Sequence, residues 1–121
     1  KQLDSGLAQL AHEGVIQIFT RQGVGLQEPW LGAVGMLQFE VFKERLKNEY
    51  NVHVKIEVLP YKVARWVGGG KEAEEWLKSR RDFKIVLDRH QRPVMLAESA
   101  WALNYALSNA PDIAFYDVEP L

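Results

Sequence analysis

The 121-residue sequence predicts a single α+β domain, and three observations lead to this prediction. Apolar residues make up 47% of the chain and charged residues 26%, which is typical of a soluble globular domain and excludes a disordered chain. The length suits one domain and is too short for two. Stretches with helical spacing of apolar residues are interleaved with stretches that have the composition and alternation of strands.

The first half of the chain predicts two helices and three strands. Gly14 lies where a glycine commonly ends a helix, and Phe39, Phe42 and Leu46 define one face of the strongest helix. Apolar and polar residues alternate along residues 52–58, which is typical of a half-buried strand. In chain order, the predicted elements are a helix over 3–11, a strand over 15–19, a loop over 21–29, a strand over 30–35, a helix over 37–50 and a strand over 52–58.

The second half predicts four strands and two helices. The three glycines at 68–70 indicate a turn between a strand and a helix, and a polar turn at 88–92 joins two strands into a hairpin. In chain order, the predicted elements are a strand over 62–67, a helix over 71–79, strands over 83–87 and 93–97, a helix over 99–109 and a strand over 113–118.

The order of these elements indicates the architecture. The second half, βαββαβ, has the order of the ferredoxin-like split βαβ unit, and the first half, αββαβ, lacks only a leading strand. Such an order favours an antiparallel or mixed sheet that carries its helices mainly on one face. We therefore predict a ferredoxin-like α+β fold, while the sequence leaves open whether the two halves share one sheet.

Residues that usually form catalytic, metal-binding or nucleotide-binding sites are absent or far apart in the sequence. The chain has no cysteine, which excludes disulfides, thiolate zinc sites, iron–sulfur clusters and a cysteine nucleophile. His12, His53 and His90 are far apart in the sequence, and the glycine runs at 23–25 and 68–70 do not match a nucleotide-binding loop. We therefore predict no catalytic, cofactor-binding or metal-binding residue and no enzyme activity in this chain. Charged residues interrupt every apolar stretch, so no membrane span is predicted.

Charge is distributed unevenly although the net charge is only −1. Residues 78–92 carry a local charge of +4, whereas residues 98–121 carry −4 and contain no Lys or Arg. A basic segment can bind a polyanion such as RNA. A solvated surface turn explains the same charges more simply, and composition by itself does not decide between the two interpretations.

Several motifs resemble those of translational GTPases. Residues 31–41 and 45–52 carry the runs LGAVGMLQFEV and RLKNEYNV, which are similar to a signature of that family. The runs ARWV at 64–67, LAESAWAL at 96–103 and APDIAF at 110–115 resemble a narrower family, the bacterial class II, GTP-dependent peptide chain release factors. The likeness covers essentially all 121 residues, and several motifs in the right order are more specific than any one of them.

This resemblance implies that residues 1–121 are a single C-terminal domain, which follows GTPase and β-barrel domains absent from this chain. The start at Lys1 without Met agrees with that expectation. In the family, the cytoplasmic, GTP-bound factor promotes dissociation of class I release factors from the ribosome during translation termination. GTP or GDP with magnesium would bind the missing GTPase domain, and this chain would hold no cofactor. The expected partners are the ribosome (ribosomal RNA and proteins), the preceding domains and, indirectly, the class I release factors.

The resemblance also makes the basic residues candidate ribosome contacts: Arg65, Lys78, Arg80, Arg81, Lys84, Arg89 and Arg92. The acidic residues 117–121 match no family pattern and are assigned no role. Two alternatives remain. One is a domain of an elongation-factor-type ribosomal translocase, which Gln38-Phe39 and the strand at 64–67 disfavour. The other is a standalone RNA-binding or ligand-binding ferredoxin-like module.

Overall fold

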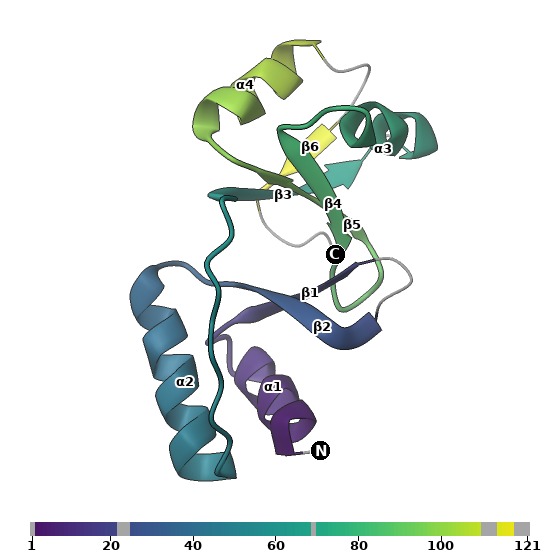
Figure 1. Ribbon diagram of the computed structural model, residues 1–121. Coiled ribbons are helices and arrows are strands. Elements are labelled where there is room, and N and C mark those ends of the chain that lie inside the picture. The colour runs from purple at the N-terminus through teal and green to yellow at the C-terminus, as the bar shows by residue number, and fades with distance from the viewer. Residues whose placement is uncertain (1, 22–24, 69, 110–113, 118–121) are drawn as a thin grey trace.

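The computed structural model describes residues 2–21, 25–68, 70–109 and 114–117 (Figure 1). Helices and strands follow one another in nearly the predicted order. They are α1 (Gln2–His12), β1 (Gln17–Arg21), β2 (Gly25–Gly32), α2 (Met36–Tyr50), β3 (Val63–Gly68), α3 (Gly70–Lys78), β4 (Phe83–Leu87), β5 (Pro93–Ala97), α4 (Ala100–Asn109) and β6 (Ala114–Tyr116).

The strands form one six-stranded sheet in the order β2-β1-β4-β5-β3-β6, and every pairing between neighbours is antiparallel. The two halves of the chain therefore share a sheet. They are joined between β1 and β4 through the pair Thr20 and Leu87. In the second half, β3, α3, β4, β5, α4 and β6 make a complete split βαβ unit. The predicted α+β, ferredoxin-like architecture is confirmed.

Each helix pair covers the strands of its own half: α1 and α2 lie against β1 and β2, whereas α3 and α4 lie against β3–β6 at the other end of the molecule (Figure 1). Ile18 and Leu31 pack with the α1–α2 core, whose buried members are Leu7, Leu10, Ile16, Phe42 and Leu46. In the second half, Phe83, Met95 and Ala97 pack beneath α3 and α4. The opposite face holds a third core, which we call the inner-face cluster. Its buried members are Phe19, Trp66, Val86, Val94 and Leu96.

Helix α2 forms where the periodicity predicts it. Phe42 and Leu46 are its buried residues, because they recur on the face turned toward α1 and the sheet. Asn51 ends the helix in the left-handed conformation at φ 54°, and its backbone N–H donates to the carbonyl of Leu46. Gly6 of α1 lies directly against this face, since a Cβ built on it would be 2.4 Å from Cδ2 of Leu46. The two helices therefore pack closely only because residue 6 has no side chain.

The predicted strand over 52–58 is wrong. Its alternation is present, because Val52, Val54 and Ile56 are half-buried against the α1–α2 core, whereas the residues between them are exposed. However, no backbone–backbone hydrogen bond joins residues 53–60 to any described residue. Alternation reports which side chains are buried, while a strand also needs a neighbouring strand to bond with. We call residues 52–58 the extended segment.

Several other boundaries differ from the prediction, and β1 spans Gln17–Arg21 instead of residues 15–19. The loop expected over 21–29 is partly strand, because β2 begins at Gly25 and ends at Gly32, before the predicted end at residue 35. Pro29 is accommodated because it lies where the pairing of β1 with β2 is irregular, between the pairs Phe19–Trp30 and Arg21–Gly25. The last strand, predicted over 113–118, ends at Tyr116 and leaves out Asp117. Its predicted ends at 113 and 118 and the rest of the C-terminal residues 118–121 lie outside the described residues, as do 1, 22–24, 69 and 110–112.

Candidate nucleic-acid interface

The seven candidate contacts do not form one patch. Arg65 on β3 pairs in register with Met95, whereas Lys84 on β4 pairs with Leu96. Met95 belongs to the core beneath α3 and α4, and Leu96 belongs to the inner-face cluster. Because residues paired across strands share a face, Arg65 and Lys84 lie on opposite faces of the sheet. Arg65 also donates from Nη1 to the carbonyl of Ala64 at 2.8 Å, which holds it along its own strand.

Three of the candidates gather at the turn between α3 and β4. The guanidinium of Arg80 lies 5.2 Å from the Trp76 ring and 4.6 Å from the Tyr105 ring, so it fills the space between α3 and α4. Such cation–π contacts hold the side chain in place. Lys78 and Arg81 on either side are exposed. The turn therefore has two exposed cations, Lys78 and Arg81, beside Arg80, which is held by the two rings.

An exposed aromatic side chain adjoins the same turn. Trp101 of α4 is 70% exposed and stacks on Tyr105, with the ring centroids 5.8 Å apart. Together with Arg80 and Trp76, these rings form a continuous row of stacked planar groups. An exposed tryptophan next to cations is chemically suited to stack on an unpaired base while the cations meet phosphates. This row and the α3–β4 turn are the best-formed candidate interface in the described part of the chain.

Arg89 and Arg92 lie at the opposite end of β4, in the β4–β5 turn (Figure 1). The five residues of β4 separate the two turns by about 14 Å at the rise of a strand. Nε of Arg92 donates to Oδ2 of Asp88 at 3.1 Å, and this carboxylate is only 4% exposed. Arg92 therefore serves the fold of the hairpin, and part of the local positive charge is neutralised within it.

Asp88 is the centre of that hairpin. Its Oδ2 accepts a hydrogen bond from Nε1 of Trp66 at 2.9 Å, and its Oδ1 accepts from the backbone N–H groups of His90 and Arg92. Burial by itself would raise the pKa of Asp88, but these hydrogen bonds, with that of the Arg92 N–H foremost, outweigh it and lower the pKa. Asp88 thus remains a carboxylate that organises the turn.

A second aromatic and basic group lies on the inner face, and Lys84 is its one member predicted from the sequence as a contact. Arg21 lies over the Trp30 ring with its Cζ 5.2 Å from the centroid, and Nζ of Lys84 lies 6.0 Å from the same centroid. Tyr61 stacks on Trp30 with centroids 5.9 Å apart, while Glu28 pairs with Arg21 at 3.5 Å. Arg21 and Lys84 are distant in sequence, and only the pairing of β1 with β4 brings them together. No sequence pattern could have found this group.

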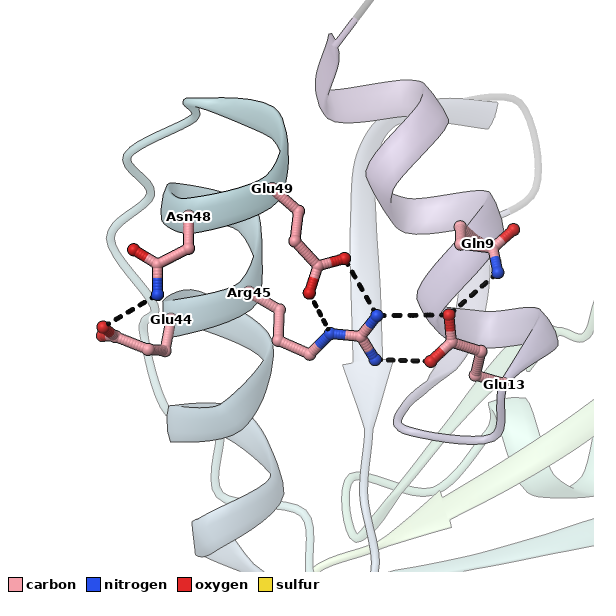
Figure 2. Close-up of polar contacts among 6 residues, drawn as sticks. All are labelled: Gln9, Glu13, Glu44, Arg45, Asn48 and Glu49. Carbon is pink, nitrogen blue, oxygen red and sulfur yellow. Dashed lines mark hydrogen bonds and ion pairs between the residues drawn. The ribbon is translucent and has the colours of Figure 1, made fainter.

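A third polar cluster joins α1 to α2 (Figure 2). The guanidinium of Arg45 donates to both carboxylate oxygens of Glu13, directly after α1, and it also bonds Glu49 one turn along α2 at 2.7 and 2.9 Å. Gln9 donates to Glu13 at 2.8 Å. The RLKNEYNV motif therefore has a mainly structural role, since Arg45 bridges the helices and Leu46 fills the core between them.

The Arg45 cluster predicts a defined pH dependence of stability. The bonds from Arg45 and Gln9 lower the pKa of Glu13 from 4.5 to about 2, and Arg45 also lowers that of Glu49. A carboxyl whose pKa is lower in the folded state stabilises the fold above its unfolded pKa and loses that contribution as the pH falls through the folded pKa. Arg45→Met should therefore melt at a lower temperature than the parent at pH 7, and the difference should shrink between about pH 4.5 and 2. A difference in melting temperature that is constant over this range would contradict the assignment, and Lys47→Met is the matched control on the exposed side of α2.

Neither a metal centre nor a membrane segment is found where the structure describes the chain. No group of three or more His, Asp or Glu side chains converges among residues 2–21, 25–68, 70–109 and 114–117. In these same ranges, no helix has the length and apolar character needed to cross a bilayer.

Comparison with known proteins identifies a family. The family model "Class II release factor RF3, C-terminal domain" matches residues 1–107. The protein named Peptide chain release factor 3 from Acaryochloris marina is 40% identical over 121 residues, which is all of this chain and 22% of that protein. Its namesake from Symbiobacterium thermophilum is 42% identical over 119 residues, covering 95% of this chain and 22% of that protein. The chain thus spans about a fifth of the length of these relatives, and it belongs to the family of class II release factor RF3 C-terminal domains.

Proposed function

We propose that this chain is the C-terminal, ribosome-facing domain of a GTP-dependent peptide chain release factor. In that role, the parent protein promotes dissociation of class I release factors from the ribosome after peptide release. The observation that carries the proposal is the family match over residues 1–107, together with relatives of the same name that align with the whole chain. These relatives favour a release factor over the elongation-factor-type translocase and over a standalone module.

The residues of this chain suggest which part of the parent protein would bind nucleotide and which part would contact the ribosome. GTP or GDP and magnesium would bind the preceding GTPase domain in the cytoplasm, and this chain would contribute no group to nucleotide hydrolysis. Its sheet and four helices would act as a rigid body whose position changes with the nucleotide state. Within this body, the α3–β4 turn presents exposed cations beside the exposed Trp101 of α4, which suits contact with ribosomal RNA.

The function of the parent can be tested with post-termination ribosomes. The full-length protein with GTP should accelerate exchange of a class I release factor, and it should fail to do so with GDP. If active ribosomes show no GTP-dependent acceleration, the assignment to termination is wrong. Movement of tRNA and mRNA by the same protein would indicate a translocase instead.

The role of the α3–β4 turn is tested separately by charge reversal in the full-length protein. Arg81→Glu should weaken ribosome binding several-fold and reduce the dependence of log K on log salt concentration by about one unit, because one phosphate contact is lost. Lys47→Glu is the matched control, since Lys47 is also exposed but lies on α2, distant in sequence from the α3–β4 turn. Equal effects of the two variants would show general electrostatic attraction and would remove the turn from the interface.

A further inference from the structure

The first half of the chain repeats the second half with one strand fewer. In the second half, β3 comes directly before α3 and lies in the sheet between β5 and β6. In the first half, α1, β1, β2 and α2 match α3, β4, β5 and α4 in order, and the extended segment matches β6. By this correspondence, a strand directly before α1 would lie between β2 and the extended segment.

A groove is present at this place. It has a volume of about 860 Å³ and lies between two walls. One wall is formed by the start of β1, the end of β2 and residues 33–34, and the other by residues 55–59 and 61–65, which lead from the extended segment into β3. Figure 1 shows this connection running alongside α2 from the end of that helix toward β3.

Both walls of the groove can accept a strand. β2 is at the edge of the sheet and pairs only with β1 among the described strands, so its other edge has no strand partner there. Backbone groups 53–60 likewise make no backbone–backbone hydrogen bond with any described residue. Unpaired backbone groups on both walls of a groove are the usual condition for β-augmentation.

The side chains around the groove indicate what kind of strand would fill it. Leu31 and Ile56 extend the α1–α2 core along one side, while the stacked rings of Trp30 and Tyr61 form the other side. Val34 at its mouth is fully exposed, and Val58 is 63% exposed. A strand in this position would be covered on both faces, so it should be rich in apolar residues.

We propose that this groove is filled, in the longer protein, by a β-strand formed by the residues immediately before Lys1. The relatives are about five times longer than this chain, and the matched family is a C-terminal domain, so they have such residues. The connection is short enough, because β3 ends at Gly68 and α3 begins at Gly70 in the complete half. The strand would run antiparallel to β2, with α1 as the crossover to β1. This inference does not depend on the proposed function.

A strand in this groove would connect the domain to the preceding ones through the sheet itself. A polypeptide that enters as a central strand is held by hydrogen bonds on both edges, unlike a flexible linker on the surface. A displacement of the preceding domain would then move the sheet and the α1–α2 core directly. The extended segment would become the outer strand of a complete first half, as β6 is in the second half.

Hydrogen exchange of the longer protein tests the proposal. Alternate amides of the extended segment and of the free edge of β2 should exchange at least about 100-fold more slowly than in an unpaired chain, together with amides in the segment before Lys1. The amides of β4 and β5 serve as the protected internal reference. Fast exchange of residues 53–57 while β4 remains protected would overturn the proposal. So would protection that disappears on dilution, which would identify a second copy as the occupant.

A pair of proline variants in the same protein provides a matched control. Glu57 and Val58 are both exposed, and their N–H groups point to opposite edges of an extended chain, so only one of them can face the added strand. One of Glu57→Pro and Val58→Pro should raise exchange of the segment before Lys1 about tenfold, whereas the other should change it less than about twofold. Equal effects of both variants, or none from either, would contradict the pairing. Because neither measurement uses the ribosome, failure here is distinct from failure of the proposed function.

Discussion

Asp88→Ala is expected to lower the free energy of unfolding by about 2–4 kcal/mol, because it removes the shared acceptor of several hydrogen bonds at once. The indole N–H of the buried Trp66 and the backbone N–H groups of His90 and Arg92 all donate to this carboxylate. Arg92 would also lose its ion pair. Urea unfolding of the chain measures the loss, and Asp88→Asn should recover part of it because an amide oxygen can still accept the N–H bonds.

The contribution of Asp88 to the stability of the fold should depend on pH. Since the pKa of Asp88 is lowered in the folded state, its contribution is present above its ordinary pKa of 3.8 and is lost as the pH falls through the folded value. The stability difference between the parent and Asp88→Ala should therefore decrease in acid. Asp82→Ala, in the turn before β4, is the control and should change stability by less than about 0.5 kcal/mol. An Asp88→Ala variant as stable as this control would refute the central role of Asp88.

Leu46→Ala is expected to cost about 2–5 kcal/mol, because Leu46 is fully buried between α1 and α2 and its loss leaves a cavity. A substitution at the neighbouring Gly6 tests the same contact between α1 and α2. Gly6→Ala would gain about 1 kcal/mol of helix propensity, yet the added methyl group would lie 2.4 Å from Cδ2 of Leu46 and 3.3 Å from Cδ2 of Tyr50. Overpacking of this kind costs about 1–3 kcal/mol, so the single variant should be less stable than the parent.

A double-mutant cycle separates these effects. In the Leu46→Ala background, the space around residue 6 is open, and Gly6→Ala should then be neutral or stabilising. The change of sign between the two backgrounds is the expected result, measured as free energies of unfolding in urea. If Gly6→Ala destabilises both backgrounds equally, the contact between Gly6 and Leu46 does not limit the approach of α1 to α2.

The candidate interface could be predicted only in part. The sequence locates its basic residues, because charge along a turn is visible without a structure. It does not show that Arg80 lies between the rings of Trp76 and Tyr105, or that Arg92 is bound to Asp88. A charge count treats these side chains as equivalent, whereas their partners come from other elements and leave Lys78 and Arg81 as the exposed cations of the α3–β4 turn.

Local pattern by itself determined the helices and most strands of this protein. Periodic burial of residues such as Phe42 and Leu46 is a property of neighbouring positions in the chain, and so are turn residues such as Asn51. Only the tertiary structure decided which strands pair. The extended segment has the alternation of a strand but no described partner, while Thr20 and Leu87, distant in sequence, join the two halves into one sheet. The physical reason is that side-chain burial depends on local periodicity, whereas a backbone ladder depends on a second strand that the rest of the fold must bring alongside.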